Sequence, residues 1–148
     1  MSGKFDASLL EIRDLKIIKG EINAPFEFDT ESINSYATDL SFDAFISKEK
    51  KIVKTEIGFD IQTQSSADQE EAIAKFVLVY LFHVENLDLI LDFEATDDKV
   101  NINERNLMMA IAAISFSTSR GVLMTRLQGT IMKDYILPII DPKEINRK

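Results

Sequence analysis

Apolar and polar residues alternate along two segments of the chain, residues 40–46 and 53–63. Because successive side chains of a strand point to opposite faces, a period of two predicts strands with one buried and one wet face. A third segment, residues 76–82, is apolar at both parities. Such a strand is covered on both faces, or one of its faces awaits a partner.

An earlier strand is predicted over residues 9–18. The parity of its apolar residues changes near Arg13 and Asp14, which indicates a β-bulge. Gly20 is expected to end this strand. Residues 20–38 are rich in Asn, Asp, Ser and Pro, which predicts a long irregular crossover to the next strand. Connections of this length are often functional.

A long helix is predicted from residue 101 onward. The sequence Asn101-Ile102-Asn103-Glu104 matches a capping box, which marks a helix start. Apolar and small residues then recur at helical spacing at Leu107, Ile111, Ile114 and Thr118. The pattern continues through Leu127, and after Gly129 the chain is apolar but broken by prolines.

The connections between the later strands, residues 48–51 and 64–72, are short and polar. They favour antiparallel hairpins over crossover helices. Residues 88–98 form an acidic connection to the helix. The predicted fold class is therefore α+β: a four-stranded antiparallel sheet, with a long crossover after strand 1, followed by one long helix. No linker or repeat interrupts residues 1–148, so a single domain is expected.

Charge and composition narrow the function. The net charge of −8 opposes general binding to phosphate backbones, so nucleic acid is not an expected partner. The chain has no cysteine. No signal peptide is recognisable, and the longest apolar runs fall far short of the ~20 residues that span a bilayer. The expectation is a cytoplasmic protein without direct membrane insertion.

Candidate chemistry is sparse. The single histidine, His83, lies in the most apolar strand, where a structural histidine is more common than a base or ligand. No phosphate-binding, nucleophile or metal-ligand motif occurs in the sequence. The expectation is a binding protein with no enzymatic activity, no cofactor and no metal.

Aromatic residues are concentrated in the predicted strands. A single helix covers only part of one face of a sheet, so some of this apolar surface is expected to remain available. Phe42 and Phe45 have opposite parity on one strand, so at least one of them should lie off the core face. Phe59 and Phe76 are expected in the core. Small residues along the helix, such as Ala110, leave one flank open to a second helix.

Several segments, in this order of elements, resemble the SecB-type protein-export chaperones. Glu21-Ile22-Asn23-Ala24-Pro25 opens the crossover. Ser119-Arg120-Gly121 is similar to a Ser-Arg-Gly inside the family's long helix, and Leu137–Pro142 is similar to the Pro-containing segment that follows it. The family usually continues into a second helix. Only Lys143–Lys148 remain here, so the resemblance implies that this helix is absent or one turn long.

The resemblance implies an ATP-independent chaperone that binds unfolded or nascent polypeptides in apolar grooves. It implies a homo-oligomer, a dimer of dimers, that serves protein export or a dedicated client such as a toxin–antitoxin pair. The residues expected to contact clients are Ala24, Pro25, Phe26, Phe28, Phe42, Phe45, Ile46 and Tyr80. An acidic surface for an export motor is expected at Glu21, Asp43 and Asp60, and the oligomer interface at Ala110, Ala113, Ser117 and Gly121.

A second hypothesis remains open beside the chaperone. The sheet and helix of a small α+β domain also suit a small-ligand-binding module with an apolar pocket between them.

Overall fold

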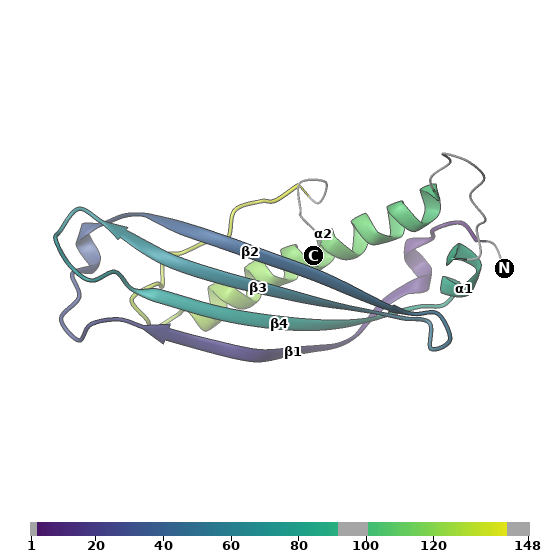
Figure 1. Cartoon of the computed structure of the whole chain (residues 1–148), viewed down its shortest axis with the longest axis horizontal. Coiled ribbons are helices and arrows are strands. Elements are labelled where there is room, and N and C mark those ends of the chain that lie inside the picture. Colours follow the sequence, from purple (N-terminus) through teal and green to yellow (C-terminus); the bar gives the residue numbers. More distant parts are fainter. Residues whose placement is uncertain (1–2, 92–100, 142–148) are drawn as a thin grey trace.

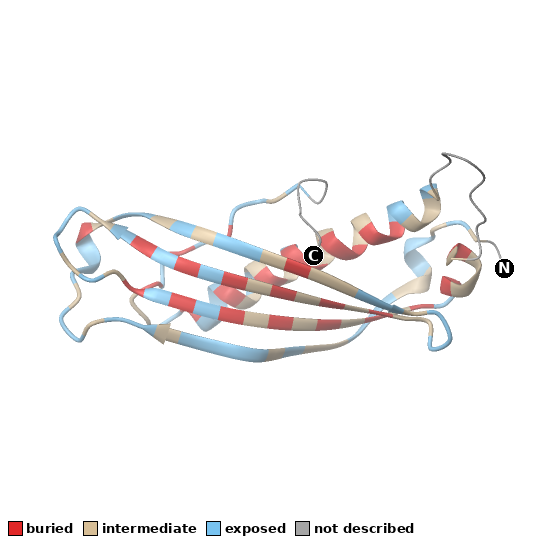
Figure 2. Cartoon of the chain, in the orientation of Figure 1, coloured by how far each residue is buried: buried red, intermediate tan, exposed pale blue. Residues whose placement is uncertain are grey.

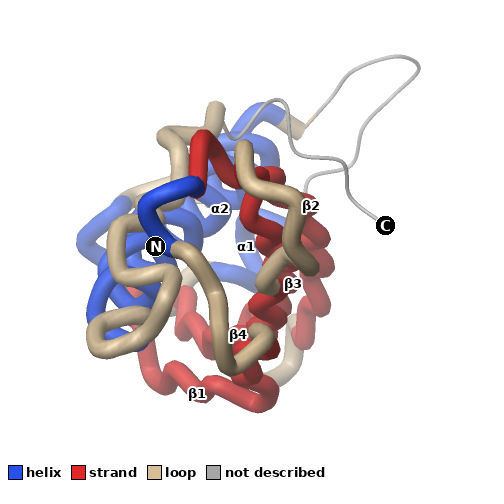
Figure 3. The backbone as a smooth tube through the Cα atoms, turned by 90° about the vertical axis from the view of Figure 1, so that its left-hand side faces the viewer, coloured by secondary structure: helices blue, strands red, loops and turns tan. Residues whose placement is uncertain are grey.

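A computed structural model describes residues 3–91 and 101–141 of the chain. The sheet and a long helix form two layers, with the helix on one face of the sheet (Figures 1 and 3). The strands are β1 (Leu10–Asn23), β2 (Ile33–Ser47), β3 (Ile52–Ser65) and β4 (Ile73–Val84). The helices are α1 (Leu87–Leu91) and α2 (Ile102–Arg126), with short 3-10 helices at Ala7–Leu9 and Thr30–Ser32.

The four strands form one antiparallel sheet in the order β1-β4-β3-β2. The predicted α+β fold class is confirmed. β1 and β2 lie at opposite edges, so the chain between them crosses the width of the sheet (Figure 1). Because an edge strand pairs on one side only, each leaves a row of backbone groups open.

The crossover is shorter than predicted. Gly20 does not end β1 but pairs with Phe76, and β1 continues to Asn23 opposite Ile73. At the other end, residues 33–38 were expected to be irregular, yet they belong to β2 and pair with β3. Only residues 24–32 cross the sheet. The polar composition wrongly indicated an irregular segment, because the outward face of an edge strand tolerates polar residues.

The predicted bulge near Arg13 is confirmed by a register shift between Ile12 and Asp14. A second shift lies between Ile17 and Lys19, and it was not predicted. Each bulge moves the following side chains to the opposite face. Ile18, inside the second bulge, is consequently exposed.

The core lies between the sheet and α2. Buried residues alternate along β3 and β4 on the face toward the helix (Figure 2). Phe59 and Phe76 are buried, as predicted. The apolar residues of the other parity on β4, such as Val77 and Val79, are half-buried on the outer face of the sheet.

α2 begins and ends close to the predicted positions. Asn101 Oδ1 accepts a hydrogen bond from the backbone N–H of Glu104 (3.0 Å), which confirms the N-cap. Two buried polar pairs join the helix to the sheet. Thr55 and Ser115 are linked at 3.1 Å, and Tyr80 Oη and Ser119 Oγ at 2.6 Å.

By length and composition alone, α2 is apolar enough to cross a membrane. Core helices pass the same test, and this helix buries Leu107, Ile111, Phe116 and Leu123 against the sheet. Its apolar character is therefore explained by packing.

Helix α1 was not predicted, because residues 88–91 were assigned to the acidic connection. The remainder of that connection, 92–98, and the segment Lys143–Lys148 lie outside the described residues.

Candidate functional site

The β2 edge carries apolar side chains that the helix does not reach. α2 crosses the sheet diagonally (Figure 1) and covers the middle of β2, where Phe42 stacks on Phe116 with ring centroids 5.9 Å apart. On the same face, Leu40 is 38% exposed and Ile46 is 42% exposed. Next to these side chains runs the open backbone edge of β2. The arrangement offers apolar contacts beside free hydrogen-bonding groups.

A pocket of about 790 Å³ opens at the N-terminal end of β2. Its walls come from the end of the crossover, the start of β2 and the turn that follows α2. Polar and apolar side chains both line it, and the lining residues are Thr30, Glu31, Ile33, Asn34, Ser35, Tyr36, Gly129, Thr130, Ile131, Lys133 and Asp134.

Residues 130–141, here called the strap, run from this pocket back across the β2 side of the molecule (Figure 1). The Tyr135 hydroxyl is hydrogen-bonded to Thr38 at 2.7 Å, and its ring meets Tyr36 edge-on with centroids 5.2 Å apart. Further along, the Arg120 side chain on α2 donates from Nε to the carbonyl of Leu137 (2.8 Å) and from a terminal nitrogen to that of Pro138 (3.1 Å). The strap thus bridges β2 and α2.

The three tyrosines share one electrostatic property. Burial raises the pKa of Tyr80 and of Tyr135 above 10.0, although the hydrogen bonds to Ser119 and Thr38 oppose the shift. Burial, together with the nearby Asp134 carboxylate, also raises the pKa of Tyr36. All three side chains are therefore neutral packing and hydrogen-bonding groups at ordinary pH.

The crossover residues differ in exposure. Phe26 is fully exposed and Ala24 is also exposed, whereas Pro25 and Phe28 are half-buried. Phe28 packs against the core. Two hydrogen bonds between the backbone of Asp29 and the Gln69 side chain hold the end of the crossover to the β3–β4 turn. Phe26 is thus presented on an anchored segment.

Phe42 and Phe45 lie on opposite faces of β2, as their parity predicts. Phe45 is 52% exposed on the outer face, where the Lys54 ammonium lies 4.9 Å from the centre of its ring. Phe42 is only 2% exposed and Tyr80 is fully buried. The expectation that these two rings lie on a client-binding surface is wrong, because Phe116 stacks on Phe42 and Ser119 binds the Tyr80 hydroxyl.

Of the three predicted acidic residues, Glu21 and Asp60 are exposed and Asp43 is half-buried. Glu21 and Asp60 lie in one row across the outer face, with Lys75 between them. Asp43 lies four residue pairs further along the β2–β3 ladder, opposite Glu56. Because cross-strand neighbours share a face, the carboxylates gather on the β2–β3 half. Lys75 interrupts the acidic surface toward β1.

The predicted interface flank of α2 is left open by the described residues. Ala110 and Ala113 are half-buried, and Ser117 and Gly121 are exposed. A Cβ added to Gly121 would meet no atom within 4 Å. These four residues are called the small-residue flank, and its exposed end at Ser117 and Gly121 leaves room for another helix to approach.

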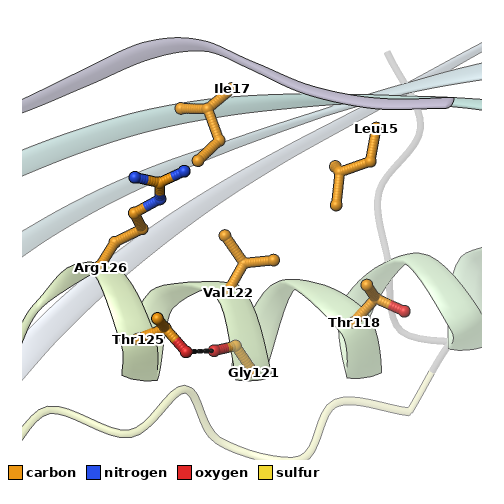
Figure 4. A pocket seen from close by; sticks show the side chains of 7 residues that line it. All are labelled: Leu15, Ile17, Thr118, Gly121, Val122, Thr125 and Arg126. Atoms are coloured by element: carbon orange, nitrogen blue, oxygen red, sulfur yellow. Dashed lines mark hydrogen bonds between the residues drawn. The ribbon is translucent and has the colours of Figure 1, made fainter.

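A second pocket, which the sequence did not indicate, lies between β1 and the C-terminal half of α2 (Figure 4). It encloses about 620 Å³, and Arg126 points across it toward Ile17. An adjoining pocket of about 510 Å³ shares these two residues and extends to Phe76. The sequence signal that could have indicated a space between the helix and this edge is the pair of bulges in β1.

Possible metal ligands do not cluster in the described part of the chain. Within residues 3–91 and 101–141, no group of three or more His, Asp or Glu side chains is placed to hold a metal ion. His83 is half-buried on the outer face, between Glu11 and Ile52 in the strand register.

The fold defined by this sheet and helix is a SecB-like fold. No known protein-family profile matches the sequence, and no curated protein matches it. Among solved structures, the Mycobacterium tuberculosis Rv1957 SecB-like chaperone, in complex with a ChAD peptide from the Rv1956 HigA1 antitoxin, is similar with a TM-score of 0.57. It is 15% identical, and the match covers 90% of this chain and 91% of that one. A protein of unknown function from Streptococcus agalactiae is similar only at a TM-score of 0.31 and 10% identity, over 88% of this chain and 95% of that one.

Proposed function

We propose that the protein is a chaperone that binds unfolded or nascent polypeptide at the β2 edge, without nucleotide. One observation carries the proposal: Leu40 and Ile46 remain exposed on the helix-covered face, beside the open edge of β2. An extended client pairs its backbone with β2 and places alternate side chains on these two residues. Backbone pairing and apolar contact are tolerant of sequence, which suits a protein that accepts unfolded chains.

The crossover and Phe45 extend the contact surface. Phe26 and Ala24 offer exposed apolar groups on the segment that leads into β2. Pro25 and Phe28 support that segment from its half-buried side. Phe45 lies on the outer face of β2, so a client that wraps the edge meets apolar side chains on both faces of the strand.

The other surfaces of the protein are the proposed contacts for assembly and for further partners. Two copies are proposed to pack through the small-residue flank of α2, which leaves the β2 edge open, and two such dimers form the oligomer. The SecB-like neighbour carries an antitoxin-derived peptide, which supports a dedicated polypeptide client here. The proposed compartment is the cytoplasm. The carboxylates of the β2–β3 half, Asp43 and Asp60 among them, are the proposed contact for an export motor or another basic partner.

The test is suppression of aggregation. A reduced, unfolded client such as reduced α-lactalbumin is incubated with the protein in the absence of ATP, and light scattering is followed. An equimolar amount of protein should suppress scattering. The same amount of a folded, unrelated acidic protein of equal net charge controls for nonspecific charge effects. No suppression at several-fold excess would refute the proposal.

A small-ligand-binding module is the second candidate, and the pocket between β1 and α2 favours it. Its apolar lining by Leu15, Ile17 and Val122 and its volume of about 620 Å³ suit a small molecule. Native mass spectrometry separates the two candidates. A protein that carries a co-purified small molecule supports the module, whereas an empty oligomer that binds unfolded client supports the chaperone.

A further inference from the structure

We infer that the strap is a built-in competitor for the client: it occupies part of the β2-edge site, and a client binds fully only when the strap is released. This inference rests on the proposed function and concerns the regulation of the same site. Arg120, with hydrogen bonds to two of its carbonyls, is one of the residues that hold the strap down.

The strap has the burial pattern of a bound extended peptide. Tyr135 and Leu137 are buried, whereas Ile136 between them and Pro138 after them are exposed. Residues 135–141 form neither helix nor strand. Alternate burial in an extended segment is how a peptide presents side chains to a groove. The strap therefore fills, with its own side chains, positions of the kind that a client would use.

Those positions adjoin the exposed residues of the β2 edge. Tyr135 contacts Tyr36 and Thr38, which lie on the same face of β2 as Leu40 and immediately before it. A client that runs along β2 from Ile46 toward the N-terminal end of the strand meets Tyr135 next after Leu40. The client's apolar side chains and Tyr135 cannot both occupy the space next to Leu40 on this face of β2.

Side chains, rather than a strand ladder, hold the strap. Its anchors include the Tyr135–Thr38 hydrogen bond, the buried side chains of Met132 and Leu137, and the two bonds from Arg120. Arg120 is half-buried, and its bond to Pro138 is exposed to solvent. Segments held by few contacts open at lower free energy than the core. Residues 135–141 can thus be released while the sheet and the buried Met132 stay in place. A client that takes over the Tyr135 and Leu137 positions offsets most of the free energy that this release costs.

The inference predicts that weaker anchoring strengthens client binding. When a competing segment closes a site, the apparent dissociation constant exceeds the intrinsic one by the reciprocal of the open fraction. Arg120→Met keeps the aliphatic stem and removes both hydrogen bonds. It should lower the dissociation constant for fluorescently labelled, reduced and carboxymethylated α-lactalbumin by roughly threefold to tenfold. Amide hydrogens of the strap should exchange faster in the same variant.

A second variant and a control complete the experiment. Tyr135→Phe keeps the buried ring and removes only the bond to Thr38, so it should produce a smaller gain in client affinity. If Arg120→Met does not fold, this variant still tests whether weaker anchoring of the strap strengthens client binding. Arg105→Gln removes an exposed cation of the same helix that does not contact the strap, and it should change neither readout.

The outcomes separate the two claims. If the wild-type protein binds the client and the released variants bind it equally or more weakly, the strap is only structural and the inference fails while the proposed function stands. If neither the wild-type protein nor any variant binds the client, both fail. Binding by the released variants alone supports the inference.

Discussion

Replacing Leu40 and Ile46 together by serine should weaken client binding without unfolding the protein. Both side chains already bury more than half of their surface against the sheet, and they expose 38% and 42% of it. Fully burying a leucine or isoleucine is worth about 1.5–3 kcal/mol. The exposed fraction that a client would cover is therefore worth about 0.6–1.2 kcal/mol for each residue.

For the pair, the loss sums to about 1.2–2.4 kcal/mol if the two contacts are independent. Since about 1.4 kcal/mol corresponds to a tenfold change, the dissociation constant should rise by roughly sevenfold to fiftyfold. Fluorescence anisotropy of a labelled, reduced and carboxymethylated client measures it directly. The backbone pairing with β2 survives the substitutions, so residual binding is expected.

The matched control is Ile18→Ser with Ile73→Ser. These isoleucines are 58% and 37% exposed, but they lie in the second bulge of β1 and on the outer face of β4. The control loses a similar apolar area, so its thermal stability and its nonspecific binding to apolar surfaces should fall to a similar degree. Equal client affinities in the two double variants would refute the assignment of the site to the β2 edge.

The remaining predictions concern stability and assembly. Ser119→Ala leaves the buried Tyr80 hydroxyl unpaired and should cost about 1–3 kcal/mol in chemical denaturation, whereas Tyr80→Phe should cost about 1 kcal/mol because the serine can bond to its own helix; additive losses in the double variant would contradict a direct bond. Since Tyr36, Tyr80 and Tyr135 hold their protons more tightly when folded, the unfolded state ionises first, and the free energy of unfolding should fall as the pH rises above 10.0. Tyr80→Phe should flatten this fall in a pH series of melts, and an unchanged slope would count against burial as its cause. Ala113→Glu should lower the mass measured by light scattering, and an unaltered oligomer would remove the small-residue flank as the interface.

The sequence predicted the elements well where one periodicity dominated. The sequence of β3 alternates cleanly because one face of this strand is fully buried, and Asn101 marks the helix start through a local hydrogen bond. The predicted β1 ended too early, at Gly20. This residue belongs to the strand because it pairs with Phe76, and the local composition does not reveal that pairing.

The candidate site was harder to predict, because exposure at a sheet edge depends on where the helix crosses. Leu40, Phe42 and Ile46 share one parity, and no local pattern separates them. The diagonal path of α2 buries Phe42 beneath Phe116 and leaves the other two open. The role of Arg120 was equally hidden. Its partners are backbone carbonyls of residues 137 and 138, and a carbonyl carries no signature in the sequence.

The two edges of the sheet differ in a way that supports the assignment of the site. β1 carries two bulges, near Arg13 and Ile18, and bulges twist an edge away from strand addition. β2 has one irregularity at its start, between Ile33 and Ser35, and then pairs without a shift through Ser47. A regular open edge is a hazard, since it invites uncontrolled pairing with other chains. Here it is flanked by exposed Leu40 and Ile46 and closed at one end by a strap that side chains hold. An edge with such a removable cover is better explained by controlled pairing with a client than by a failure of the fold to protect it.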